Sequence, residues 1–325
     1  MTILICFGTR PEFIKVKSLI DNLNNIKTCY IKQHKDLLND IKTDYIINID
    51  DLTNNRLNNV ISNVLLKNNI FENIEYVLVQ GDTTTAFSIA LSAFNNNIKI
   101  IHLEAGLRSN NMYDPYPEEM NRCLISRMSN IHLCPTELNK QNLLIENIKE
   151  NIYVVGNTGL DNINKENCCY ENKVLITLHR RDNHDIMDNW FIEINNIAKQ
   201  YKDIEFILPI HPNPNVLKHK YLLTNINVIE PLKHNELIEI IKKCKFVISD
   251  SGGLQEECSF LNKKIIICRK TTERPEVLNT HGILCNDYTQ LNNIVNDIMY
   301  NYYVNKECPF GDGFSWKKIK DVLNC

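Results

Sequence analysis

Short apolar runs of strand length recur along the chain, and each is followed by a turn and an amphipathic stretch of helix length. Apolarity within the runs is continuous rather than alternating, which is typical of strands buried on both faces and therefore of parallel sheets flanked by helices. In the first half the runs are Ile3–Phe7, Thr28–Ile31, Tyr76–Val79, Ile98–Leu103, Ile131–Cys134 and Ile152–Val155. In the second half they are Val174–Leu178, Glu205–Ile210, Ile226–Ile229, Phe246–Ser249, Lys264–Cys268 and Ile283–Cys285.

Two successive α/β halves of similar length predict two doubly wound, Rossmann-like domains. The polar stretch from Asn164 to Lys173 lies between the halves and is the expected linker. A final helix is expected at Ser315–Leu323, after the turn PFGDG. Ligands of such sheets bind outside the carboxyl ends of the strands, so two domains with those ends facing each other would form a deep cleft.

Composition limits the classes of function. The 325 residues carry 36 Lys and Arg against 39 Asp and Glu, a net charge of -3, so there is no basic excess to hold a nucleic-acid backbone. No apolar run approaches the roughly 18 residues of a membrane span, and Ile3–Phe7 is too short for a signal peptide. The 12 cysteines are mostly scattered singly without zinc spacing, which is typical of buried thiols in a reducing compartment. We therefore expect a cytoplasmic protein without nucleic-acid or membrane partners.

The first predicted strand is followed by the turn GTRPE, which begins at Gly8, and by a helix that bears Lys15. Arg10 and Lys15 flank the start of this helix, where free N–H groups already favour an anion. Such a turn can also be an ordinary strand–helix connection. No GxGxxG or GxxxxGK(S/T) motif occurs, which argues against a standard dinucleotide or Walker site.

Three carboxyl groups lie after later strands of the first half. Asp82 is part of QGDTTT, where it could simply cap the next helix, and Glu104 directly follows a buried strand. Glu118 lies in PEEMNR, which also supplies Arg122 as a possible partner. A carboxylate at the end of a buried strand is costly unless it is paired or functional. Because all three would meet at one edge of the sheet, the pattern indicates acid/base chemistry.

The strand ends of the second half carry cationic groups and backbone N–H groups instead. His179 begins HRR and His211 begins HPNP, although a lone histidine after a strand is often structural. The turn Ser251-Gly252-Gly253 opens a helix and is suited to bind a phosphate on backbone N–H groups, and Arg274 would lie nearby. Glu257, one turn into that helix, could accept hydrogen bonds from ribose hydroxyls or be a solvated helix acid. The second half therefore predicts a diphosphate site.

Taken together, these segments closely resemble the non-hydrolysing UDP-N-acetylglucosamine 2-epimerases. The matching stretches run in family order from Gly8 to Gly313: GTRPEFIK, QGDTTTAF, HLEAGLRS, PEEMNR, CPTELNKQNLL, VGNTGLD, LHRRD, HPNPNV, SDSGGLQEE, TTERPE and PFGDG. The resemblance implies a GT-B type fold and a homodimer. It implies an N-terminal domain of residues 1–166 plus the returning helix 309–325, and a UDP-binding domain of residues 167–308.

The resemblance also implies the reaction. Members interconvert UDP-GlcNAc and UDP-ManNAc by eliminating UDP and adding it back through a 2-acetamidoglucal intermediate. Matched positions imply catalytic roles for Asp82, Glu104, Glu118 and His179. They imply UDP-binding or substrate-binding roles for Arg10, Lys15, His211, Ser251, Gly252, Gly253, Glu257 and Arg274. No metal or other cofactor is implied, because the proton at C2 is exchanged without redox chemistry.

Three departures from the family pattern matter. One is Asp182, which is one methylene shorter than the Glu that relatives usually carry after His-Arg-Arg. In relatives the segment that reads EPLKHNEL here contacts uracil through a Gln or similar residue and an aromatic residue, whereas Leu232 and Leu237 take those places in this chain. The stretch from Gln33 to Asn58 is shorter than in many bacterial members, whose second, regulatory UDP-GlcNAc binds there.

Other functions fit parts of the pattern. A 2-epimerase of a modified UDP-sugar, such as a diacetamido-uronate or a 6-deoxy-acetamido sugar, would use the same elimination. A hydrolysing epimerase would release free ManNAc, but Pro11-Glu12 departs from the turn of that class. A GT-B glycosyltransferase would need one dominant base rather than three acids. A binding protein without activity would be favoured only if one of the four catalytic positions had been replaced.

Overall fold

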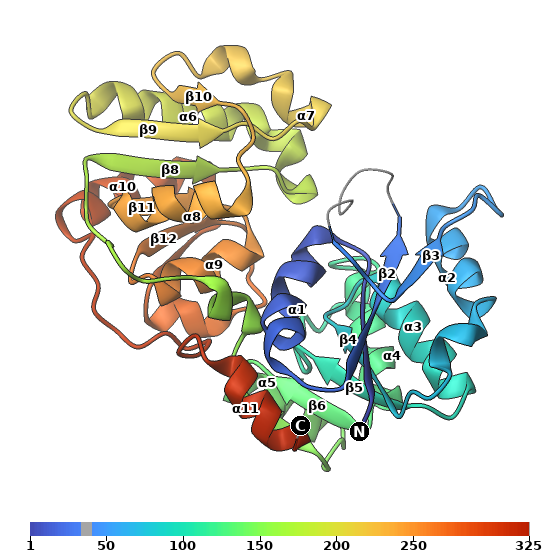
Figure 1. Ribbon diagram of the computed structural model, residues 1–325. Coiled ribbons are helices and arrows are strands. Elements are labelled where there is room, and N and C mark those ends of the chain that lie inside the picture. Colours follow the sequence, from blue (N-terminus) through green and yellow to red (C-terminus); the bar gives the residue numbers. More distant parts are fainter. Residues whose placement is uncertain (34–40, 325) are drawn as a thin grey trace. The chain divides into compact units, whose positions relative to one another are not determined.

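The computed structural model describes residues 1–33 and 41–324. The chain divides into two compact units, an N-terminal unit of Met1–Asn162 with Gly311–Cys325 and a C-terminal unit of Ile163–Phe310. Each unit holds one parallel β-sheet with helices on both faces (Figure 1). The α/β class expected from the apolar runs is therefore confirmed.

The sheet of the N-terminal unit has seven strands in the order β3-β2-β1-β4-β5-β6-β7. The strands are β1 Ile3–Phe7, β2 Ile26–Lys32, β3 Tyr45–Asn48, β4 Tyr76–Gln80, β5 Lys99–Leu103, β6 Ile131–Cys134 and β7 Ile152–Val154. The helices are α1 Arg10–Asn22, α2 Arg56–Leu65, α3 Thr84–Asn95, α4 Glu118–Met128, α5 Glu137–Ile145 and α11 Ser315–Leu323.

Side chains of this sheet point alternately into two apolar layers. On β1, Leu4 and Cys6 belong to the core beneath α2, α3 and α4. Ile5 and Phe7 of the same strand belong to the opposite core, which α1 and α11 cover. Burial on both faces explains why the strand reads as a continuous apolar run.

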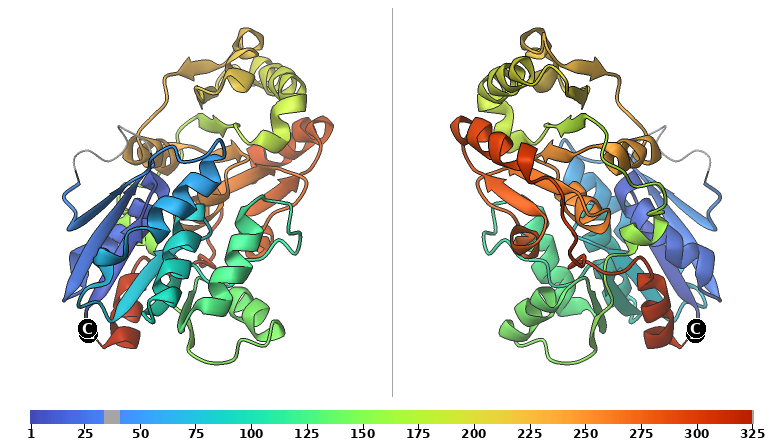
Figure 2. Two further views of the ribbon diagram at one scale, coloured as in Figure 1. Left: turned by 90° about the vertical axis from the view of Figure 1, so that its right-hand side faces the viewer. Right: turned by 90° about the vertical axis from the view of Figure 1, so that its left-hand side faces the viewer.

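The sheet of the C-terminal unit has six strands in the order β10-β9-β8-β11-β12-β13. The strands are β8 Lys173–Thr177, β9 Glu205–Pro209, β10 Asn227–Ile229, β11 Phe246–Ser249, β12 Lys264–Cys268 and β13 Gly282–Cys285. The helices are α6 Met187–Gln200, α7 Pro214–Leu217, α8 His234–Lys243, α9 Gly252–Phe260 and α10 Leu291–Tyr300. Helices α6 and α10 share one large core with the sheet, and α8 and α9 contact β8 and β12 (Figure 2).

The strand order reverses direction once in each sheet, between β1 and β4 and between β8 and β11. At such a switch point the two following loops diverge to opposite faces and leave room for a ligand at the carboxyl ends of the strands. The N-terminal unit places the turns that follow Phe7 and Gln80 at this point. The C-terminal unit places the turns that follow Thr177 and Ser249 there.

Every apolar run predicted as a strand is a strand, with ends shifted by no more than two residues. The edge strand β3 was missed. Its four residues alternate in burial, and the side chain of Ile46 is 57% exposed, so the segment lacks the continuous apolar pattern of a central strand. Part of the stretch from Gln33 to Asn58, residues 34–40, lies outside the described residues.

Helix α11 is fastened to the N-terminal unit through Asp161, in the 3-10 helix Thr158–Asn162. The Asp161 carboxylate accepts the backbone N–H groups of Ser315 and Trp316, each at 2.9 Å, and the hydroxyl of Ser18 at 3.1 Å. Two of the N–H groups that a helix start leaves unbonded are thus satisfied by a residue far away in sequence.

We expect Asp161→Asn to lower the free energy of unfolding by about 1–3 kcal/mol, because an amide cannot accept all three hydrogen bonds. Urea denaturation measures this change. Asp321→Asn, an exposed position on α11 itself, is the matched control and should stay within about 0.5 kcal/mol of the parent protein. Equal stability of the two variants would contradict the proposed role of Asp161 in holding α11 on the N-terminal unit.

Candidate active site

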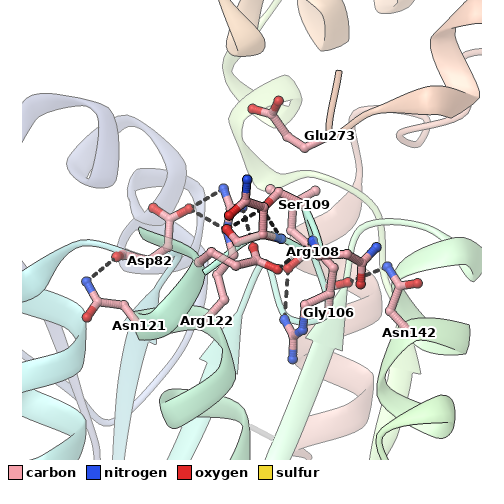
Figure 3. Close-up of polar contacts among 12 residues, drawn as sticks. Asp82, Gly106, Arg108, Ser109, Asn121, Arg122, Asn142 and Glu273 are labelled. Atoms are coloured by element: carbon pink, nitrogen blue, oxygen red, sulfur yellow. Dashed lines mark hydrogen bonds and ion pairs between the residues drawn. The ribbon is translucent and has the colours of Figure 1, made fainter. Parts of the chain in front are cut away.

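Asp82 follows β4 and is held by a buried arginine of α4. Arg122 Nε lies 2.8 Å and Nη2 2.6 Å from Asp82 Oδ2, and Nη1 lies 3.0 Å from Glu119 Oε2 (Figure 3). Arg122 is only 5% exposed, whereas the Asp82 side chain is 24% exposed. The guanidinium therefore fixes one carboxylate oxygen and leaves the carboxylate within reach of a ligand.

Glu118 is the first residue of α4, whose first turn lies against Asp82. Asn121 Nδ2 donates a hydrogen bond of 2.8 Å to the carbonyl oxygen of Asp82. Arg122, the partner suggested by the sequence, contacts Asp82 and Glu119 rather than Glu118. Glu118 Oε2 is buried and has no hydrogen-bond partner among the residues that the structure describes. A native protein rarely leaves such an atom unsatisfied, so this oxygen is a candidate to meet a substrate.

Glu104 directly follows β5 in a left-handed backbone conformation, with φ of 65°. Non-glycine residues seldom adopt this conformation, and it is concentrated at functional sites. Glu104 Oε2 accepts hydrogen bonds from Lys15 Nζ at 2.5 Å and from Gln80 Nε2. The structure thus places Lys15, which the sequence assigns to UDP, beside a predicted catalytic carboxylate.

The loop after Glu104 depends on a glycine. Gly106 has φ of 84°, and a Cβ there would lie 2.1 Å from the carbonyl oxygen of Asn139. The carbonyl oxygen of Gly106 accepts a hydrogen bond of 2.9 Å from Asn142 Nδ2 (Figure 3). Arg108 then forms two hydrogen bonds with the Glu146 carboxylate, at 2.6 and 3.0 Å. These contacts fix the backbone that follows Glu104 in sequence.

Glu12 connects the turn that contains Arg10 with the turn that contains Asp82. No local sequence pattern indicates this role. The Glu12 carboxylate accepts hydrogen bonds from Gly8 N at 3.1 Å, Thr9 Oγ1 at 2.7 Å and Thr83 Oγ1 at 2.6 Å. Glu12 is 2% exposed, and burial raises the pKa of its carboxyl group. Arg10 itself is exposed at the first position of α1.

In the C-terminal unit, Asp250 fixes the loop that carries His179. The fully buried Asp250 carboxylate accepts the N–H groups of His179 at 2.9 Å and Arg180 at 2.8 Å, and Asn183 Nδ2 at 3.0 Å. The rings of His179 and His211 stack with centroids 5.1 Å apart. Partial burial, with electrostatic repulsion from the neighbouring His179 ring, lowers the pKa of His211.

The start of α9 is the place where the sequence predicts an anion site. Ser251 is the N-cap residue and supplies no side-chain cap, so the first N–H groups of the helix remain available. A Cβ at Gly252 would lie 2.8 Å from Arg274 Nη1, so glycine lets this guanidinium lie close to the helix start. Arg274 Nε lies 2.5 Å from Glu256 Oε1, and Arg274 Nη1 lies 2.8 Å from Glu273 Oε1. Burial alone would raise the pKa of Glu273, but Arg274 and a second neighbouring arginine outweigh it and hold that pKa well below its usual range.

Farther along α9, Glu257 Oε1 lies 2.7 Å from His234 Nε2, at the first position of α8. Both side chains are partly exposed. Leu232 and Leu237, which flank His234 in sequence, are half-buried.

The N-terminal unit carries Arg10, Lys15, Asp82, Glu104 and Glu118 among the residues predicted from the sequence. The C-terminal unit carries His179, His211, Ser251, Gly252, Gly253, Glu257 and Arg274. Within the described ranges, no group of three or more His, Cys, Asp and Glu side chains could hold a metal ion. No helix in that part of the chain is long and apolar enough to cross a bilayer.

Comparison with known proteins assigns the family. A family model described as UDP-N-acetylglucosamine 2-epimerase matches residues 25–324. A UDP-N-acetylglucosamine 2-epimerase of Campylobacter jejuni is 38% identical over 374 aligned residues, which cover 99% of this chain and 97% of the relative. The chain belongs to the UDP-N-acetylglucosamine 2-epimerase family.

Solved structures of the family agree over the full length. The crystal structure of UDP-GlcNAc 2-epimerase from Neisseria meningitidis bound to UDP-GlcNAc has a TM-score of 0.89 at 34% identity and covers 100% of both chains. The Methanocaldococcus jannaschii enzyme in complex with UDP-GlcNAc and UDP has a TM-score of 0.82 at 31% identity and covers 100% of this chain and 99% of its own. The expected fold class, two Rossmann-like domains of the GT-B type, is therefore confirmed.

A buried histidine supports the turn of Asp82 in this epimerase-family chain. His102 Nε2 lies 2.9 Å from the carbonyl oxygen of Gly81, and Nδ1 is buried without a partner in residues 1–33 and 41–324. Burial lowers the pKa of His102 to about 3. The imidazole is therefore neutral, with Nε2 donating to Gly81.

This histidine predicts a pH dependence of stability. The unfolded chain, with a histidine pKa of about 6.5, binds the extra proton first as the pH falls, so stability is complete above that value and is lost toward pH 3. We expect His102 to lower the free energy of unfolding by about 2 kcal/mol between pH 7 and pH 5. In urea titrations His102→Gln should lose this part of the pH dependence and keep the parts that come from His132 and His281, because burial lowers the pKa of each to about 4. His219→Gln should behave like the parent, and an unchanged pH dependence in His102→Gln would refute the neutral imidazole.

Proposed function

We propose that this chain interconverts UDP-GlcNAc and UDP-ManNAc by eliminating UDP and adding it back through a 2-acetamidoglucal intermediate. The observation that carries the proposal is the gathering of carboxyl groups at the carboxyl ends of β4 and β5 and at the start of α4. Full-length similarity to epimerases crystallised with UDP-GlcNAc supports the same reaction.

The proposed reaction needs a base at the sugar and positive charge at the leaving group. A carboxylate removes the proton from C2 while the C1–O bond breaks, and the bonding electrons leave with the β-phosphate of UDP. The C2–H electrons form the C1=C2 double bond. A proton delivered to the opposite face of C2, with return of UDP to C1, gives the epimer. No electrons are gained or lost overall, so the reaction calls for no redox cofactor.

We assign the proton transfers to Asp82, Glu104 and Glu118. Asp82 has one oxygen held by Arg122, and Glu118 has a buried oxygen without a partner in the described part of the chain, so each has an oxygen suited to a substrate proton. Glu104 is held close to Lys15, whose ammonium group would offset negative charge that develops nearby.

We assign the UDP contacts to residues around α9 and to the first turn of α1. The N–H groups of Gly252 and Gly253 and the hydroxyl of Ser251 would bind the diphosphate, with Arg274 beside them. Arg10, Lys15 and His179 would add positive charge or hydrogen bonds at the phosphates. Glu257 would accept from the ribose, and His211 would lie toward the sugar.

We further propose that the two units are the two domains of the enzyme, which forms a homodimer and works in the cytoplasm. All described cysteines are free thiols, and the cytosol keeps such thiols reduced. Light scattering coupled to gel filtration would measure the oligomeric state.

Proton NMR of the purified protein with UDP-GlcNAc in deuterium oxide tests the reaction. We expect UDP-ManNAc to form with deuterium at C2 in both epimers, because each turnover exchanges that proton with a carboxyl group. Free ManNAc with UDP would indicate a hydrolysing enzyme instead. Absence of turnover with UDP still bound would exclude this substrate and direct the search to modified UDP-2-acetamido sugars.

Changing each proposed acid to its amide separates chemistry from binding. Asp82→Asn, Glu104→Gln and Glu118→Gln should each lower kcat by at least about 100-fold, the usual contribution of a positioned acid or base, while the Kd of UDP changes little. Arg274→Ala should do the reverse and mainly weaken UDP binding. Glu72→Gln, at an exposed position, should leave both quantities unchanged. Parental turnover in all three amide variants would disprove the assignment.

A further inference from the structure

His234 and Glu257 meet across two helices of the C-terminal unit, 23 residues apart in sequence. We propose that His234 is a positioning residue that holds the Glu257 carboxylate for the ribose hydroxyls of the nucleotide. The inference rests on the proposed function for UDP as the ligand. The inference adds His234 as the residue through which the contact with Glu257 distinguishes a ribose from a deoxyribose.

Hydrogen bonds fix both the contact between His234 and Glu257 and the helix start that carries His234. His234 Nε2 donates to Glu257 Oε1 at 2.7 Å. His234 is the first residue of α8, where the preceding N–H of Lys233 is bonded to Glu236 Oε2 at 2.7 Å. The start of α8 is thus fixed in place, and it carries the imidazole with it.

The position of Glu257 along α9 suits a nucleoside diphosphate. Glu257 follows Gly252 by five residues, so it lies about 7 Å farther along the helix axis than the N–H groups at the helix start. A diphosphate at the helix start would therefore place its ribose beside Glu257. Carboxylates in other nucleotide-binding α/β folds accept hydrogen bonds from ribose hydroxyls.

The shared carboxylate can still bind a ligand. An ionised carboxylate has about four acceptor sites, and the imidazole uses one of them. His234 is bonded to Oε1, and the Glu257 side chain is 16% exposed, so the carboxylate can accept further hydrogen bonds. By fixing Oε1, His234 removes the rotational freedom that Glu257 would otherwise lose on binding, which favours the bound geometry.

The residues on either side of His234 make the ribose contact more important for recognition of the nucleoside. Leu232 and Leu237 lie on either side of His234 in sequence and carry no group that could form a hydrogen bond with the edge of uracil. We therefore expect side-chain recognition of the nucleoside near α8 to depend on the ribose, through the Glu257 carboxylate that His234 holds.

Calorimetric binding of three ligands to the full chain tests the proposal. The ligands are UDP, 2′-deoxy-UDP and inorganic pyrophosphate, and the proteins are the parent, His234→Phe and His234→Gln. We expect the parent to bind UDP about 10-fold more tightly than 2′-deoxy-UDP, the usual effect of a hydrogen bond to a charged group. His234→Phe should reduce this ratio to below about threefold without changing pyrophosphate binding. His234→Gln should restore part of it, because its amide can donate to Glu257.

His219→Phe makes the same substitution elsewhere in the C-terminal unit and should keep the parental ratio. An equal loss of affinity for UDP and 2′-deoxy-UDP in His234→Phe would mean that His234 only joins α8 to α9, and would overturn the proposal. A parental protein that does not discriminate between these two ligands would overturn it as well. Preserved discrimination in a protein without epimerase turnover would instead refute the proposed reaction and leave the role of His234 standing.

Discussion

Parallel pairing of buried strands is the constraint from which the site geometry follows. In each sheet the strand order reverses at one pair of neighbouring strands, β1 and β4 in one and β8 and β11 in the other. The connections that follow the two strands of such a pair run to opposite faces of the sheet. Because every strand points the same way, all the connecting turns at one end carry residues that follow an apolar run. Asp82, Glu104, His179 and Ser251 are brought to the carboxyl ends of their sheets for this reason.

Buried charges near these ends occur in pairs or are fully hydrogen-bonded, as desolvation requires. Arg122 lies between two carboxylates, Arg274 does the same, and Asp250 accepts three N–H groups. Such networks restrict the positions of the side chains that would contact substrate. Among the described residues, Glu118 Oε2 at the start of α4 is a buried acid oxygen without a hydrogen-bond partner, and it is therefore a place for a ligand.

The two units divide the proposed chemistry according to their charges. The N-terminal unit presents carboxyl groups, which suit proton transfer at a sugar carbon. The C-terminal unit presents helix N–H groups, histidines and Arg274, which suit a diphosphate leaving group. Positioning residues connect these groups to the fold. Glu12 joins two turns of one unit, and His234 joins two helices of the other.

The sequence by itself determined the strands, the α/β class and the residues that follow each strand, because continuous apolarity and turn chemistry act over short range. It also contains the motifs that match the family. Only the tertiary structure decided the strand order, the edge strand β3, and the partners of the charged groups. Lys15 lies beside Glu104, and Arg122 contacts Asp82 and Glu119 rather than Glu118. These pairings join residues that are distant in sequence or on one helix face, so they depend on how helices pack against a sheet, which no local pattern encodes.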